Sequence, residues 1–200
     1  MNEKEIEAIF VQNGELLKTS ELYRFGVSKY EVKKYTELGL LDRITQGYYK
    51  LSASDISDSK LISLMIPEAV LTFDSALFYF GYSDRIPQQW HLAVDKDISK
   101  AKVRIDYPFN EPYYIECKLL SIGVESITVD DSKMNIFSRD RLICECLKYE
   151  GKMDIETMNK AIINYIEDPK KNISKLMDYA EIRGVTKKER MTESYVMKGK

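Results

Sequence analysis

The hydrophobic and polar positions at the start of the chain follow a helical period twice. Apolar side chains recur at helical spacing over residues 3–11, and Asn13-Gly14 ends that pattern. Thr19 can serve as the N-cap of a second, shorter helix over residues 20–25, which Gly26 ends. The pattern therefore predicts two helices joined by a short connection.

A third helix is predicted from Ser28 to Leu38. Ser28-Lys29-Tyr30-Glu31 has the sequence of a capping box, in which the Ser28 hydroxyl accepts from the amide of Glu31 and the Glu31 carboxylate accepts from the amide of Ser28. Gly39 follows the last helical residue and allows the chain to leave the helix.

The period then changes to that of β-strands. Residues 41–45 and 48–51 are two short strand-like runs around Gln46-Gly47, which predicts a hairpin. In the expected register Thr45 lies opposite Tyr48, and Arg43 lies opposite Lys50. These four side chains would share one face of the hairpin. Three apolar side chains would share the other face, against the helices: Ile44, Tyr49 and Leu51.

A run of small polar residues over 52–59 separates this pattern from the rest of the chain and reads as a linker. We therefore expect two domains, over residues 1–55 and 60–200. In the second we expect helices near 60–66 and 75–82, strands at 90–94, 103–107, 113–119 and 124–129, and helices at 139–149, 155–166, 173–182 and 186–197. The predicted fold class is α+β, in which a mixed α/β domain with a helical end follows the N-terminal module.

Three helices followed by a hairpin is the order of a winged helix-turn-helix, a DNA-binding module. Val32, Tyr35 and Leu38 would face the first two helices, whereas Lys29, Lys33 and their polar neighbours point outward. The candidate DNA-contacting residues carry polar or basic side chains on these elements: Lys18, Ser20, Arg24, Ser28, Lys29, Tyr30, Lys33, Lys34, Arg43, Thr45, Gln46, Tyr48 and Lys50. We expect the third helix in the major groove and the hairpin at the neighbouring minor groove.

Charge supports this prediction only through its distribution. The whole chain has a formal net charge of -2, made up of 0 over residues 1–51, -6 over 52–182 and +4 over 183–200. Between Lys18 and Lys50, however, 7 basic side chains stand against 4 acidic ones. The local surplus lies where a recognition helix and wing would meet phosphates.

The residue types present favour neither a metal site nor a disulfide framework. Cys117, Cys144 and Cys146 are an odd number at unsuitable spacings, and His91 is the single histidine. We therefore expect no metal and no cofactor, and a reducing, cytoplasmic location. The charged N-terminus and the absence of a long apolar run indicate neither a signal peptide nor a membrane span.

Two carboxylates, Asp95 and Asp97, lie at the end of an expected strand. With Gly81 and Ser83 upstream they suggest a nucleotidyltransferase site. Such a site needs adjacent Gly and Ser beside the phosphates, and here Tyr82 separates them. We expect no enzyme activity.

Residues 17–22, 26–28 and 38–51 resemble the N-terminal domain of the AbiEi antitoxin family. The family segment G-x-L-x-R-x-x-x-G-x-Y-x-L is matched in order by Gly39, Leu41, Arg43, Gly47, Tyr49 and Leu51. A fainter similarity continues through residues 75–81, 93–94 and 140–143.

The resemblance implies a transcriptional autorepressor and antitoxin of a two-gene toxin–antitoxin system used in phage defence by abortive infection. It implies two partners, operator DNA with inverted repeats and a nucleotidyltransferase toxin. We expect a monomer or weak dimer in solution that binds its operator cooperatively. The alternative is a non-catalytic adaptor, because small trihelical modules with a hairpin also dock proteins.

Overall fold

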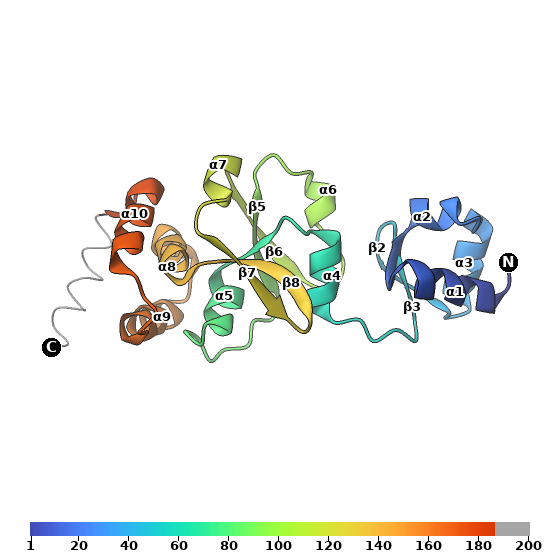
Figure 1. Cartoon of the computed structure of the whole chain (residues 1–200), viewed down its shortest axis with the longest axis horizontal. Helices are drawn as coiled ribbons and strands as arrows, with labels where there is room; N and C mark the ends of the chain where they lie inside the picture. The colour runs from blue at the N-terminus through green and yellow to red at the C-terminus, as the bar shows by residue number, and fades with distance from the viewer. Residues whose placement is uncertain (187–200) are drawn as a thin grey trace. The chain divides into compact units, whose positions relative to one another are not determined.

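The computed structural model describes residues 1–186, which divide into two compact units (Figure 1). The first unit comprises Met1–Pro67, Ser99–Asn110 and Val129–Ser132, and the second comprises Glu68–Ile98, Glu111–Thr128 and the chain from Lys133 on. The predicted domains, 1–55 and 60–200, stay a prediction, because this division reflects compactness alone. The helix predicted over 186–197 lies almost wholly outside the described residues.

The first unit begins with three helices. They are α1 (Glu3–Asn13), α2 (Thr19–Arg24) and α3 (Lys29–Glu37). The capping box of α3 is confirmed, since Glu31 N donates to Ser28 Oγ (3.2 Å) and Ser28 N donates to Glu31 Oε2 (2.8 Å). The N-cap predicted for α2 is wrong: Thr19 is its first helical residue, and the cap position is Lys18. There the Glu21 carboxylate accepts from Lys18 N at 2.7 Å.

The hairpin strands β2 (Leu41–Thr45) and β3 (Tyr48–Leu51) have the predicted ends. A third strand, β1 (Leu16–Lys18), pairs antiparallel with β3, so the sheet has the order β1-β3-β2. The sequence pattern did not predict β1, because three residues are too few to show a period of two.

The predicted register of the hairpin is correct at the turn and wrong beyond it. Thr45 lies opposite Tyr48 as expected, but Arg43 pairs with Tyr49 and not with Lys50. A bulge between Arg43 and Thr45 shifts the pairing by one residue. Because side chains alternate along a strand, this shift breaks up the predicted four-residue face.

The helices and the sheet of the first unit enclose one core. Its buried members are Ile6, Phe10, Leu17, Leu22, Val27, Val32, Tyr35 and Leu41. Val32 and Tyr35 of α3 therefore face inward as predicted. The prediction for Leu38 is wrong, since its side chain is 62% exposed. It follows the last residue of α3, where the chain already turns toward Gly39.

Two further helices belong to this unit. They are α4 (Asp58–Met65) and the short α6 (Lys100–Val103). The strand predicted over 103–107 is wrong, because α6 ends at Val103 and an irregular segment follows.

The second unit is built around a five-stranded sheet of order β6-β5-β4-β8-β7 (Figure 1). Its strands are β4 (Val70–Leu71), β5 (Trp90–Asp95), β6 (Asn110–Ile115), β7 (Val124–Val129) and β8 (Ser132–Phe137). Strand β4 pairs antiparallel with β5 and parallel with β8. The sequence pattern did not predict β4 or β8.

Helices complete the second unit: α5 (Phe73–Tyr79), α7 (Cys117–Leu120), α8 (Arg139–Lys148), the 3-10 helix η1 (Glu150–Lys152), α9 (Ile155–Glu167) and α10 (Ile173–Arg183). Helix α8 is the central one, in contact with α5, α9 and α10. The chain is thus mixed α/β, and its last described element is a helix. No helix in residues 1–186 is long and apolar enough to cross a membrane.

Helix α8 also carries a buried charged cluster. The Glu145 carboxylate accepts from Arg141 Nε at 2.7 Å and from Arg183 Nη2 at 2.8 Å. Arg141 and Glu145 are fully buried. One carboxylate therefore compensates two guanidinium groups away from water.

Candidate nucleic-acid interface

Helix α3 separates its side chains into a buried and an exposed face. Lys29, Lys33 and Lys34 are all exposed, and Tyr30 is 75% exposed. The buried positions between them contact the core of the first unit. The exposed face therefore presents three ammonium groups and one phenol, all of them groups that can contact phosphate or base edges.

Glu31, the acidic residue in the first turn of α3, interacts with groups of its own chain. The Glu31 carboxylate accepts from the Met1 ammonium (2.6 Å), from Ser28 Oγ (2.7 Å) and from Ser28 N (2.8 Å). The ammonium of Met1, followed by these Ser28 donors, lowers the pKa of Glu31 to about 2. The carboxylate is therefore ionised and is already used by groups of its own chain.

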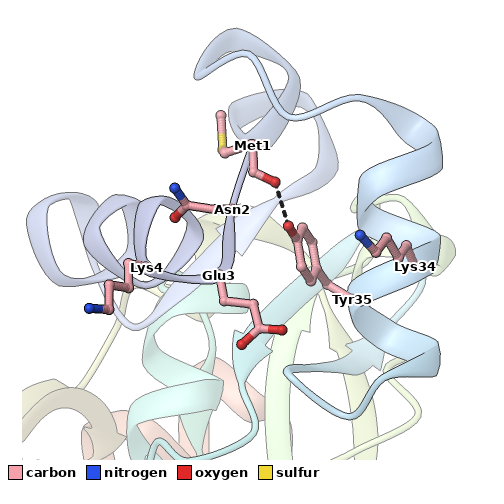
Figure 2. Close-up of a pocket in the computed structure, with 6 residues that line it drawn as sticks. All are labelled: Met1, Asn2, Glu3, Lys4, Lys34 and Tyr35. Carbon is pink, nitrogen blue, oxygen red and sulfur yellow. Dashed lines mark hydrogen bonds between the residues drawn. The ribbon is translucent and has the colours of Figure 1, made fainter.

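A hydrogen bond between Tyr35 and the first residue joins α3 to the segment before α1. Tyr35 Oη donates to the carbonyl of Met1 at 2.5 Å. Figure 2 shows this bond in a shallow hollow that is also lined by Asn2, Glu3, Lys4 and Lys34. The Lys34 ammonium lies 5.5 Å from the centre of the Tyr35 ring. This bond helps to hold α3 in place against the segment that precedes α1.

Helix α2 and the end of β1 add three exposed candidates, Lys18, Ser20 and Arg24. The Lys18 ammonium lies 5.6 Å from the centre of the Tyr48 ring, at the start of β3. Lys18 and Tyr48 also lie opposite each other in the sheet, so this contact joins β1 to β3.

At the hairpin turn the candidates differ in accessibility. Arg43 and Gln46 are exposed, whereas Thr45 is buried. Thr45 Oγ1 donates to Asp106 Oδ2 (3.2 Å) and accepts from Asp106 N (3.3 Å), within the same unit. Nothing in the sequence indicated this partner, which lies 61 residues further along the chain.

Lys50 is likewise engaged by its own chain. Its ammonium donates to the carbonyl of Ser54 at 2.7 Å and lies 3.6 Å from Asp42 Oδ2. The Lys50 side chain is only 15% exposed. The shifted register explains this arrangement, since it places Asp42 opposite Lys50.

One further acid lies on the exposed face of α3. Glu37 Oε1 is 3.7 Å from the Lys33 ammonium, and both side chains are well exposed. An exposed pair of this kind contributes little, so a phosphate can replace the carboxylate at low cost. The exposed basic candidates are therefore those on β1, α2, α3 and β2, whereas Thr45 and Lys50 contribute little exposed area.

No protein-family model matches this chain, and no curated protein matches it in sequence. Within residues 1–186 there is also no group of three or more His, Cys, Asp or Glu side chains that could hold a metal ion.

Proposed function

We propose that this protein is a DNA-binding transcriptional autorepressor and that residues 1–55 are a winged helix-turn-helix. The observation that carries the proposal is the exposed face of α3, where Lys29, Lys33 and Lys34 lie together above a buried apolar face. The order of three helices and a hairpin supports the same reading.

In this proposal α3 enters the major groove and the hairpin turn meets the neighbouring minor groove. The α3 lysines attract phosphates and release counterions, and Tyr30 offers a hydroxyl or a stacking face to a base. Arg43 and Gln46 are the hairpin side chains exposed to the minor groove. Two copies on inverted repeats would exclude polymerase. With about three to five phosphate contacts per copy, the logarithm of the affinity falls with the logarithm of the salt concentration with a slope of about -3 to -5.

We further propose that the protein is the antitoxin of a nucleotidyltransferase toxin. This part rests on the resemblance to the AbiEi family, which spans the wing segment from Gly39 to Leu51 and, more faintly, the second unit.

A second candidate function is that of an adaptor whose N-terminal module docks a protein. The observation in its favour is a set of exposed apolar or aromatic side chains on this module: Tyr23, Phe25, Tyr30 and Leu38. Side chains of this kind are common at protein interfaces. Purification without nuclease discriminates between the candidates, because a DNA-binding module retains nucleic acid and an adaptor does not.

The direct test is a gel-shift assay on the DNA upstream of the protein's own gene. The test variant replaces Lys29, Lys33 and Lys34 with alanine. The matched control variant replaces three exposed lysines of the second unit, Lys133, Lys170 and Lys175. Both variants lose three positive charges. A difference between their DNA affinities therefore reflects where the lysines lie and not the net charge of the protein.

We expect the α3 variant to lose at least about tenfold in affinity and its salt slope to become shallower by about 2 to 3. The control variant should bind within about twofold of the unmodified protein. Equal losses in the two variants, or undiminished binding by the α3 variant, would overturn the assignment of α3.

The antitoxin proposal is tested by co-expressing the full-length α3 variant with the neighbouring gene, both from unrelated promoters. Autorepression cannot contribute under these conditions. Relief of toxicity by the variant supports an antitoxin activity separate from DNA binding. No relief by the unmodified protein would refute the antitoxin proposal.

A further inference from the structure

The second unit contains a cavity of about 120 Å³ that the DNA-binding proposal does not use. Several elements contribute to its lining, among them α5 with Asp74, β5 with His91, β6 with Tyr113 and η1 with Lys152. Polar side chains of several different elements thus converge on one partly enclosed space, which is typical of a small-molecule site.

Arg85, Asp154 and Thr157 also line the cavity, and they form a polar network with Glu156. Arg85 donates to Asp154 Oδ2 (3.0 Å) and to Glu156 Oε2 (2.9 Å). Asp154 also accepts from Thr157 N and from Thr157 Oγ1, both at 2.9 Å. Two carboxylates therefore compensate Arg85, and this network has structural partners for its charges.

The other polar lining residues, Asp74, His91, Tyr113 and Lys152, make weaker contacts. The Asp74 carboxylate is 3.9 Å from His91 Nε2, and Tyr113 Oη is 3.4 Å from His91 Nδ1. Both separations exceed those of good hydrogen bonds. Lys152 has its ammonium 5.5 Å from the centre of the Tyr149 ring. No ion pair joins Asp74 to Lys152 among the contacts of the described residues.

Two of the lining residues, Phe73 and Tyr113, belong to an aromatic cluster. The centres of the Phe73 and Tyr113 rings lie 4.2 Å apart, and the Phe73 and Tyr149 rings pack edge to face at 5.6 Å. Phe73 is also one of the few non-glycine residues with a left-handed backbone, at φ 40°. Such a backbone is costly for a phenylalanine and is often retained at binding sites.

The charges available to a ligand are those of Asp74 and Lys152. Burial lowers the pKa of His91, although Asp74 and Glu111 act in the opposite direction. Burial, followed by the same two carboxylates, raises the pKa of Tyr113 to about 12. The imidazole and the phenol are therefore neutral near pH 7, and one carboxylate and one ammonium remain.

We propose that this cavity binds a small zwitterion of amino-acid size, with its ammonium group on Asp74 and the aromatic face of Tyr113 and its carboxylate on Lys152. The opposite charges of the two side chains suit a ligand that carries both signs. A ligand with one charge would leave the other side chain of the site without a partner. An aromatic face beside a carboxylate is a suitable place for an ammonium group.

The size of the cavity sets the size of the ligand. A volume of about 120 Å³ is enough for several water molecules or a small solute. This small volume favours a ligand of amino-acid size over a larger one. The proposal is independent of DNA binding, because every residue it uses belongs to the second unit.

The first test measures thermal unfolding of the full chain with each common L-amino acid added singly at millimolar concentration. A ligand at about a hundred times its dissociation constant should raise the melting temperature by about 5 °C or more. The best amino acid is then compared with the amine that lacks its carboxylate and the acid that lacks its amino group, and both should give no shift. Failure of every amino acid, or equal shifts with either analogue, would overturn the proposal.

The second test measures the dissociation constant by calorimetry for Asp74→Asn and Lys152→Gln. Each removes one charged contact and should weaken binding at least about tenfold. The matched controls are Asp84→Asn and Lys160→Gln. Asp84 and Lys160 pair with each other at 2.6 Å and line a neighbouring open pocket. Controls should bind within about twofold of the unmodified protein.

The Asp74 side chain is 43% exposed and Lys152 is exposed, so both variants should fold. Their melting temperatures without ligand check this. Equal weakening by the test and control variants would overturn the placement of the ligand, and unchanged binding by both test variants would do the same.

Discussion

Replacing Lys50 with methionine should destabilise the first unit and leave the affinity for DNA unchanged. The sequence placed Lys50 beside Arg43 on the wing, but its ammonium donates to the carbonyl of Ser54 and faces Asp42. Methionine keeps the length of the side chain and removes these polar contacts. Arg43→Met is the matched comparison, because Arg43 is an exposed base on the same hairpin.

The magnitude follows from the contacts of Lys50. A hydrogen bond of 2.7 Å from a charged donor that is mostly buried contributes about 1.5 kcal/mol. The 3.6 Å pair with the half-exposed Asp42 adds about 0.5 kcal/mol. Lys50→Met should therefore lower the free energy of unfolding by about 2 kcal/mol, which increases the unfolded fraction roughly thirtyfold. Arg43→Met should change it by less than about 0.5 kcal/mol.

Urea denaturation followed by circular dichroism measures the first effect, and fluorescence anisotropy on duplex DNA at several salt concentrations measures the second. Arg43→Met should make the salt slope shallower by about 1, and Lys50→Met should not alter it. The reasoning would be refuted if Lys50→Met changed the slope while leaving the stability intact.

Three further predictions concern stability. Glu145→Gln should lower the free energy of unfolding by about 3–5 kcal/mol, because it removes the charge that two buried guanidinium groups share; a small change in urea denaturation would contradict this. Gly123→Ala should cost about 2–4 kcal/mol in the same assay, because its Cβ would lie 2.9 Å from Arg141 Cβ and the left-handed backbone adds strain of about 1 kcal/mol. Gly81→Ala, in open space at a similar φ, is the control and should cost about 1 kcal/mol; equal losses would point to backbone strain alone. Glu31 has a pKa lowered from 4.5 to about 2, so its contribution to stability is complete above 4.5 and is lost as the pH falls toward 2; an NMR titration with a midpoint at the ordinary value would show that its contacts are absent in solution.

Local features were predictable because their partners are close in the chain. The capping box of α3 joins residues three positions apart, and the hairpin ends follow from Gln46-Gly47 and its flanking strands. The inward direction of Val32 and Tyr35 follows from the helical period alone.

Features that depend on partners far apart in the chain could not be predicted from the sequence pattern. The sequence pattern did not predict β1, β4 or β8. Strands β1 and β4 are too short to show a period, and β4 and β8 pair with each other although they lie far apart in the chain. The cavity of the second unit is another example, since its residues lie between Phe73 and Thr157 on separate elements. Nothing in the sequence indicated that Asp74 and Tyr113 lie beside His91.

The sequence by itself determined which basic residues exist and that Lys29, Lys33 and Lys34 occupy one side of a helix, because a helix fixes the direction of its side chains by spacing. Only the tertiary structure decided which basic side chains stay open to a partner. A single bulge in the hairpin places Lys50 opposite Asp42, and the Lys50 ammonium donates to the carbonyl of Ser54. Thr45 is hydrogen-bonded to a residue 61 positions further along the chain. Accessibility is a property of all the atoms around a side chain, and most of those atoms belong to residues that no local pattern can specify.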